Sequence, residues 1–274
     1  MQLVTGPANA TDHRIKWTSS NKTAATVDEN GTVTALRPIE TVTITAVYKT
    51  NPALTCSWNL KITRTKGYIT KQMLDNLDLT SIKKVMITAH PDDETLWGGG
   101  HLIEGEYLVV CMTHGWNPKR RTAFEQTMRT TNDKYLILDY PDVRKTFSNG
   151  KYETDMLSTC KNAMQEDINL ILSYKKWDLI ATHNPFGEYG KFLHKTISQM
   201  VTQCYNKMTN KSATLYYFGR YYNSSNKIPG EQIAPELLAI KNSMVGRYYP
   251  TAKGAIDAFG HMIPYENWLL PSEW

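Results

Sequence analysis

The chain has 274 residues, with 31 Lys and Arg against 26 Asp and Glu and a net charge of +5. This length allows one large domain or a large and a small one. The mild basic excess, densest at Lys119-Arg120-Arg121, indicates a solvated face and not a nucleic-acid surface, and the lack of any run of about 18 apolar residues excludes a membrane-spanning helix.

Residues 1–65 are rich in Thr, Val, Asn and Ala, and they show strand signals with almost no helix signals. Asn30-Gly31 lies between two runs that alternate apolar and polar residues, which is a strong hairpin signal. Short strands separated by turns at this spacing predict a small all-β sandwich. The strands are expected at Arg14–Thr18, Ala24–Asp28, Thr32–Leu36, Thr41–Val47 and Cys56–Thr63.

This region resembles a group-2 bacterial immunoglobulin-like domain, a kind of module typical of bacterial surface proteins. The first strand of that family should precede Leu3 and is absent, so we expect a truncated module, cut from a longer surface protein, with an uncovered sheet edge. The start Met1-Gln2-Leu3-Val4 also lacks the pattern of a signal peptide. The resemblance implies an extracellular or cell-surface location and association with the cell wall, with a spacer role favoured over direct binding. It is carried by Trp17-Thr18-Ser19-Ser20-Asn21, Ala25-Thr26-Val27-Asp28, Asn30-Gly31, Val33-Thr34-Ala35-Leu36 and Thr43-Ile44-Thr45-Ala46.

Residues 66–83 are predicted to be a linker with a short helix over Thr70–Leu77. Strand and helix signals alternate from residue 84 to residue 274, which predicts an α/β domain. We expect a Rossmann-like, mostly parallel sheet with helices on both faces, including helices over Thr122–Asp133 and Asp155–Ser173. The strands are expected at Val85–Ala89, Tyr107–Thr113, Tyr135–Leu138, Leu179–Thr182 and Thr214–Phe218.

The first of these strands ends in His90-Pro91-Asp92-Asp93-Glu94, which brings one imidazole and three carboxylates into a small volume. Clustered negative charge is costly unless a positive ion lies among it, and imidazole with carboxylate ligands suits zinc. A solvated acidic turn is the alternative. His114 and His183 also follow strands, so they should reach the same edge of the sheet, although each is more often a structural histidine than a ligand.

Two motifs in this order resemble the LmbE-like family, which includes the PIG-L-type N-acetylglucosaminyl-phosphatidylinositol de-N-acetylases and the deacetylases of thiol-sugar biosynthesis. The resemblance covers about residues 84–270. It implies that His90, Asp93 and His194 bind Zn²⁺ and that Asp92 is the general base for a metal-bound water. The motifs are Ala89-His90-Pro91-Asp92-Asp93-Glu94 followed by Gly98-Gly99, and Gly187-Glu188-Tyr189-Gly190 followed by His194.

The resemblance also suggests roles for other residues. Lys191 stands where the family usually has a histidine, so it either supplies positive charge to the oxyanion or marks a slow or inactive member. Tyr189 matches a tyrosine that polarises the scissile carbonyl, with a packed loop aromatic as the alternative. Arg121 and Asp142 are expected to bind substrate, with a surface ion pair to Glu125 and a turn acid as the respective alternatives. Glu94 either orients the ligands or caps the following helix.

We therefore expect a zinc-dependent deacetylase that acts on an N-acetylated amino sugar or glycan, although this ligand set also accepts iron, cobalt or nickel. One alternative is a surface carbohydrate-binding or adhesion protein whose deacetylase domain is degenerate. Another is an amidase that acts on a thiol-sugar conjugate.

Overall fold

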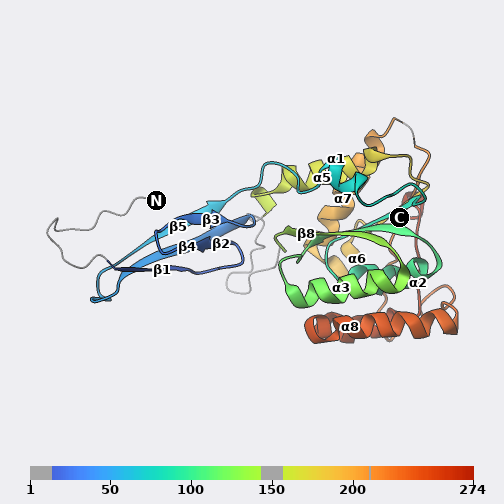
Figure 1. Cartoon of the computed structure of the whole chain (residues 1–274). Helices are drawn as coiled ribbons and strands as arrows, with labels where there is room; N and C mark the ends of the chain where they lie inside the picture. Colours follow the sequence, from blue (N-terminus) through green and yellow to red (C-terminus); the bar gives the residue numbers. More distant parts are fainter. Residues whose placement is uncertain (1–13, 143–156, 210) are drawn as a thin grey trace. The chain divides into compact units, whose positions relative to one another are not determined.

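The computed structural model describes residues 14–142, 157–209 and 211–274 (Figure 1). The chain divides into two compact units. The first holds residues 14–66 and 157–163, and the second holds the other described residues. Of the predicted linker, residues 66–83, all but Lys66 belong to the second unit. The Asp167 carboxylate accepts the backbone N–H groups of Tyr68 and Ile69 at 2.9 and 2.8 Å.

The first unit contains two antiparallel sheets. Its buried centre is one face of the longest strand, where Val42, Ile44 and Ala46 alternate with exposed or half-buried residues. The rings of Trp17 and Trp58 stack on this face, with centroids 5.8 Å apart. The predicted hairpin and all five predicted strands are confirmed. The sheets are β1 (Ile15–Ser19), β4 (Ile39–Tyr48) and β5 (Thr55–Ile62), and β2 (Ala25–Val27) with β3 (Val33–Ala35).

The second unit is built on a five-stranded parallel sheet in the order β10-β9-β6-β7-β8. The chain adds strands on one side of β6 and then returns to the other side, so the strand order reverses between β6 and β9. Ligand sites in open parallel sheets form at such a reversal, beyond the carboxyl ends of the strands. The strands are β6 (Lys84–Thr88), β7 (Tyr107–Thr113), β8 (Lys134–Tyr140), β9 (Leu179–Thr182) and β10 (Thr214–Tyr217), as predicted to within two residues.

Helices cover both faces of this sheet (Figure 1), which confirms the predicted layers. One face carries α2 (Asp93–Glu104), α3 (Pro118–Thr131) and α8 (Pro235–Phe259), which contact one another. The other carries α1 (Lys71–Asp75), α5 (Lys161–Tyr174) and α7 (Phe192–Lys207), and the short α6 (Gly187–Gly190) precedes α7. Residues 155 and 156 of the predicted second helix lie outside the described residues.

The helix α3 begins four residues earlier than predicted, because Asn117 caps it and Pro118 occupies its first turn. The Asn117 side chain accepts the backbone N–H groups of Lys119 and Arg120, a standard way to begin a helix. No described helix has the length and apolar character that crossing a bilayer requires.

The helix α2 runs through Gly98-Gly99-Gly100, residues of low helix propensity. A Cβ at Gly98 would lie 2.7 Å from the Met86 side chain, and a Cβ at Gly99 would lie 2.9 Å from the Lys241 side chain. These glycines therefore let α2 approach β6 and α8 closely. Tight packing here fixes the first turn of α2, which carries Asp93 and Glu94.

Gly219→Ala is expected to destabilise the protein by about 1–3 kcal/mol, because an added Cβ would overlap the backbone carbonyl of Asn267. Gly246→Ala is the matched control, because that glycine lies within α8 with no neighbouring atom within 4 Å of an added Cβ. The control is expected to stabilise by up to about 1 kcal/mol. Urea unfolding of both variants measures the difference, and equal stabilities would contradict the close approach of residues 219 and 267.

Candidate metal centre

Polar side chains follow four neighbouring strands of the parallel sheet. His90 follows β6, His114 follows β7, Asp142 follows β8 and His183 follows β9. The carboxyl ends of parallel strands meet at one edge of the sheet, so these residues gather where the strand order reverses. The three histidines are buried.

Three side-chain atoms converge there. His90 Nδ1 lies 3.2 Å from Asp93 Oδ2 and 3.0 Å from His194 Nε2, and His194 Nε2 lies 3.4 Å from Asp93 Oδ2. A tetrahedral zinc ion with bonds of about 2.0–2.1 Å keeps its ligand atoms roughly 3.3 Å apart. His90, Asp93 and His194, the metal-binding triad, therefore fit one small divalent ion, and three protein ligands leave a position open for water or substrate.

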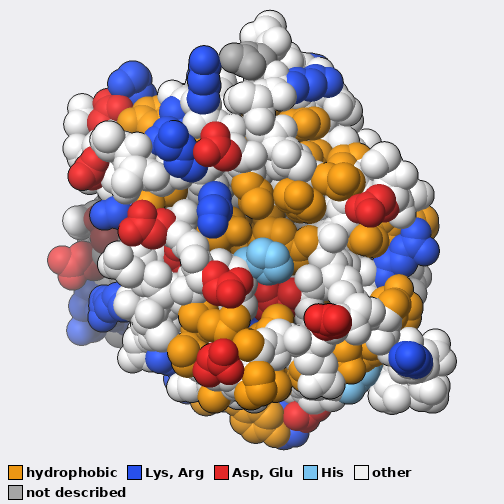
Figure 2. All heavy atoms as spheres, turned by 90° about the vertical axis from the view of Figure 1, so that its right-hand side faces the viewer, with side chains coloured by type: hydrophobic (Ala, Val, Ile, Leu, Met, Phe, Trp, Pro, Cys, Tyr) orange, Lys and Arg blue, Asp and Glu red, His pale blue; other side chains and the backbone are white. Residues whose placement is uncertain are grey.

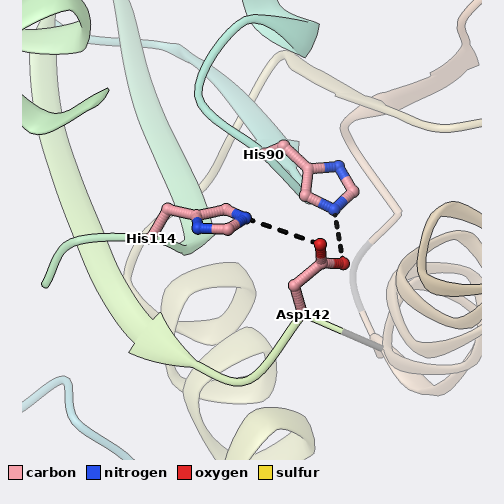
Figure 3. A group of neighbouring side chains, drawn as sticks. All are labelled: His90, His114 and Asp142. Atoms are coloured by element: carbon pink, nitrogen blue, oxygen red, sulfur yellow. Dashed lines mark hydrogen bonds and ion pairs between the residues drawn. The ribbon is translucent and has the colours of Figure 1, made fainter. Parts of the chain in front are cut away.

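The two imidazoles of the triad each face a carboxylate with their other nitrogen. His90 Nε2 lies 2.9 Å from Asp142 Oδ1 (Figure 3), and His194 Nδ1 is hydrogen bonded to Glu188 Oε2. A proton on each of these outer nitrogens leaves His90 Nδ1 and His194 Nε2 with lone pairs that point to Asp93. This is the tautomer pair that a bound metal ion requires.

Asp92, at the N-cap of α2, is held beside the triad in a strained backbone conformation with φ of 143°. Burial and the charge of Asp93 raise the pKa of Asp92 to about 7, although Arg120 opposes the rise. A carboxyl group with this pKa can both accept and return a proton near neutral pH, as a general base must.

The buried Glu94 fixes the position of Asp92. Its carboxylate accepts the Asp92 backbone N–H at 3.0 Å, the Thr95 hydroxyl at 2.7 Å and the Tyr248 hydroxyl at 2.6 Å. Of the two roles expected for Glu94, these contacts favour orientation of the motif over capping of α2.

The neighbouring residues Arg121 and Arg120 contact different partners, and only Arg120 reaches Asp92. Arg121 Nε donates to the Gly115 carbonyl at 2.6 Å, and one of its terminal nitrogens lies 3.7 Å from Glu125. Arg120 donates to the Thr251 carbonyl at 3.1 Å and places its other terminal nitrogen 3.8 Å from Asp92 Oδ2. The sequence places Arg120 only in a basic cluster, because consecutive basic residues on a helix give no signal of which one faces the site.

Lys191 and Tyr189 approach the site from the second motif. Burial raises the pKa of Asp142, but His90, His114 and Lys191 outweigh burial and hold that pKa well below its usual range. The charge of Lys191 is therefore close enough to influence Asp142. The centroids of the Tyr189 and His194 rings lie 5.7 Å apart. The Tyr189 side chain is partly exposed, and its partial desolvation together with nearby carboxylates raises the pKa of Tyr189, which keeps its hydroxyl protonated.

Asp142 lies between two histidines and not in an isolated turn (Figure 3). Its Oδ1 faces His90, and its Oδ2 lies 3.6 Å from His114 Nε2. Its contact with a triad histidine carries no local sequence signal, because the two residues are 52 positions apart.

One face of the protein carries histidine, acidic and hydrophobic side chains close together at its surface. Figure 2 shows a histidine side chain near the centre of this face, with acidic side chains beside it and hydrophobic side chains around it. Exposed rings near the candidate site include Tyr189, which packs against Phe259, and Trp116, which lies beside His114. Aromatic rings of this kind can pack against the apolar faces of a sugar.

Comparison with known proteins gives one family match, at the start of the chain, and one relative that is similar over more than half of the chain. Residues 1–57 match the family described as "Bacterial Ig-like domain (group 2)", which confirms the resemblance drawn from the sequence. Protein L374 of Acanthamoeba polyphaga mimivirus, which carries the name "Uncharacterized protein", is 31% identical over 175 residues, which cover 58% of this chain and 67% of that protein.

Two further proteins are similar over parts of their length. Protein CA_P0160 of Clostridium acetobutylicum, also named uncharacterized, is 33% identical over 97 residues, so the match covers 35% of this chain and only 10% of that protein. The crystal structure of the conserved protein TT1542 from Thermus thermophilus superposes with a TM-score of 0.50 at 14% identity. The superposition covers 69% of this chain and 94% of the Thermus thermophilus chain. This likeness concerns the fold alone.

Proposed function

This chain belongs to the same family as protein L374 of Acanthamoeba polyphaga mimivirus, and we propose, from its site, that it is a metal-dependent hydrolase that deacetylates an N-acetylated amino sugar. The observation that carries the proposal is the convergence of three buried ligand atoms from His90, Asp93 and His194 beside the carboxyl group of Asp92. A buried carboxyl group with a pKa of about 7 beside a metal site can act as a general base, which the activation of a water molecule requires.

The two sequence motifs suggest which family of hydrolases the second unit resembles. We propose a member of the LmbE-like, PIG-L-type deacetylases with a Rossmann-like α/β domain, because both motifs occur in the family order. The strand order, which reverses beside the triad, supports this assignment.

A divalent ion at the triad would supply Lewis acidity to the amide carbonyl and lower the pKa of a water to about 7. In our proposal Asp92 takes the proton of the attacking water and later gives it to the departing amine. Lys191 and the Tyr189 hydroxyl stabilise the negative charge that develops on the carbonyl oxygen. Cleavage of the C–N bond then yields acetate and a free amino sugar.

The metal is proposed to be zinc, on the grounds of two imidazoles and one carboxylate. The substrate is proposed to be a cell-surface or extracellular glycan, because group-2 immunoglobulin-like modules are typical of bacterial surface proteins. That module would associate the protein with the cell wall.

Acetate release from N-acetylglucosamine oligomers tests the proposal. Zinc-loaded protein is expected to release acetate, and chelator-treated protein is expected to do so only after zinc is restored. A panel of N-acetylated sugars and thiol-sugar conjugates distinguishes the glycan substrate from the amidase alternative. Absence of release from the whole panel, despite bound metal, would refute the hydrolase and favour a carbohydrate-binding protein.

Lys191 is the specific observation that favours this binding-protein alternative, because the family has a histidine there. Lys191→Met is expected to lower kcat by about 10²-fold without loss of metal, since one stabilising group for the carbonyl oxygen is removed. Lys195→Met, one turn later on the exposed face of α7, is the matched control and should retain full activity. Equal kcat values for the two variants would remove Lys191 from the reaction.

Arg120→Gln is expected to shift the rise of kcat/KM with pH to higher pH. Arg120 lowers the pKa of Asp92, so its removal raises that pKa, and a more alkaline solution is then needed to ionise the base. Arg129→Gln serves as the control, because Arg129 lies on the same helix with an exposed side chain and contacts Glu125 at 3.9 Å. Identical pH profiles for both variants would show that Arg120 does not act on the base.

A further inference from the structure

Glu188 is a buried carboxylate that adopts a strained backbone conformation, with φ of 55°. Non-glycine residues occupy this region at a cost, which is retained where the surrounding structure needs the geometry. The carboxylate accepts the Asn184 backbone N–H at 3.1 Å, contacts His183 Nδ1 at 3.1 and 3.2 Å, and is hydrogen bonded to His194 Nδ1. The strained turn thus places one carboxylate between two imidazoles, only one of which belongs to the triad.

His183 is held from both of its ring nitrogens. Its Nε2 lies 2.9 Å from the Ala89 backbone nitrogen, which donates its N–H to the ring, and 3.4 Å from Asp93 Oδ2. Its Nδ1 faces the Glu188 carboxylate at 3.1 and 3.2 Å. His183 therefore holds Glu188 in place against the end of β6, immediately before His90.

A second carboxylate lies behind the other histidine of the triad. Asp142 Oδ1 lies 2.9 Å from His90 Nε2, and Asp142 Oδ2 faces His114 Nε2 at 3.6 Å (Figure 3). The two arrangements have the same order: an outer histidine, a carboxylate and a triad histidine. The Glu188 arrangement has the closer contacts, since 3.6 Å exceeds the length of an ordinary hydrogen bond.

We propose that Glu188 and Asp142 are positioning residues that set the affinity and geometry of the metal site through His194 and His90. A carboxylate that accepts the outer N–H of a metal-binding histidine fixes its tautomer and ring orientation and increases its basicity. This inference rests on the proposed metal site and goes beyond it, since it gives Asp142 a role toward the metal and not toward a sugar hydroxyl.

Loss of a carboxylate that accepts the outer N–H of a metal-binding histidine weakens metal binding by about 10–100-fold. Glu188→Gln should give the larger effect, because an amide has one acceptor oxygen for three N–H donors. Asp142→Asn should give the smaller effect, because its outer contact with His114 is longer.

Competition between the protein and a chromophoric chelator for Zn²⁺ measures this affinity without any substrate. The visible spectrum of Co²⁺-loaded protein reports ligand geometry in the same samples. Both variants are expected to bind Zn²⁺ more weakly than the wild type and to shift the Co²⁺ bands. Glu104→Gln is the control, the same chemical change at an exposed position at the end of α2, and it should match the wild type.

The outcomes separate the inference from the proposed function. A wild-type protein that binds neither Zn²⁺ nor Co²⁺ overturns the metal site itself. Wild-type affinity and spectra in both variants, beside a wild type that binds metal, overturn the inference alone. Should Glu188→Gln fail to fold, Asp142→Asn decides: a raised KM for substrate with unchanged metal affinity would assign Asp142 to substrate binding instead.

Discussion

Asp92→Asn is expected to lower kcat for acetate release by about 10²–10⁴-fold, the usual contribution of a positioned general base. The Asp92 carboxyl group lies beside the triad, and burial with the charge of Asp93 brings its pKa to about 7. An asparagine preserves the shape of the side chain but cannot accept the proton of the attacking water. Single-turnover and steady-state assays on zinc-loaded protein measure the loss.

Metal content distinguishes this effect from damage to the site. Asp92 is outside the triad, so Asp92→Asn should bind zinc like the wild type, whereas Asp93→Asn should lose both metal and activity. Activity of Asp92→Asn within a few-fold of the wild type would show that another group accepts the proton.

Glu266→Gln is expected to destabilise the protein by about 3–5 kcal/mol, because it leaves the charge of Lys241 buried without its partner. Both side chains are buried, and Lys241 Nζ lies 2.6 Å from Glu266 Oε1. The same carboxylate accepts the backbone N–H groups of Gly100 and His101 at 2.6 and 3.1 Å, and thereby holds α2 to the C-terminal segment.

The contribution of Glu266 depends on pH. Burial raises the pKa of Glu266, but Lys241 and His101 outweigh burial and lower it to about 2. An unfolded glutamate has a pKa of about 4.3, so this ionised group contributes about 3 kcal/mol above that value. The contribution is lost as the pH falls from about 5 toward 2, because protonation then favours the unfolded chain.

Urea unfolding at several pH values tests both statements. The wild type should lose stability through the acidic range, and Glu266→Gln should lose less, because it lacks the titrating group. The double variant Lys241→Met with Glu266→Leu should recover much of the stability, since an apolar pair can replace a buried ion pair. An unchanged acid dependence in Glu266→Gln would contradict the assigned pKa.

Local pattern in the chain was sufficient for much of the fold. Period-two alternation with Asn30-Gly31 specifies the hairpin of β2 and β3, because the side-chain period of a strand is a local property. The apolar runs before His90 and His183 specify parallel strands in the same way. The triglycine helix α2 carried no comparable signal, because glycine disfavours helices. Its glycines are explained only by the close approach of the Met86 and Lys241 side chains, which leaves no room for a Cβ at Gly98 or Gly99.

For the site, the spacing of His90 and Asp93 is local, since one tight turn brings residues three positions apart together. His194 lies 104 positions from His90, and its place depended on family resemblance until the sheet brought the two rings together. The choice of Arg120 over Arg121 beside Asp92, and the carboxylates of Asp142 and Glu188 behind the triad, required tertiary contacts. Such pairings leave no periodic trace in the sequence, because they are decided by which strand ends and helix faces meet in space.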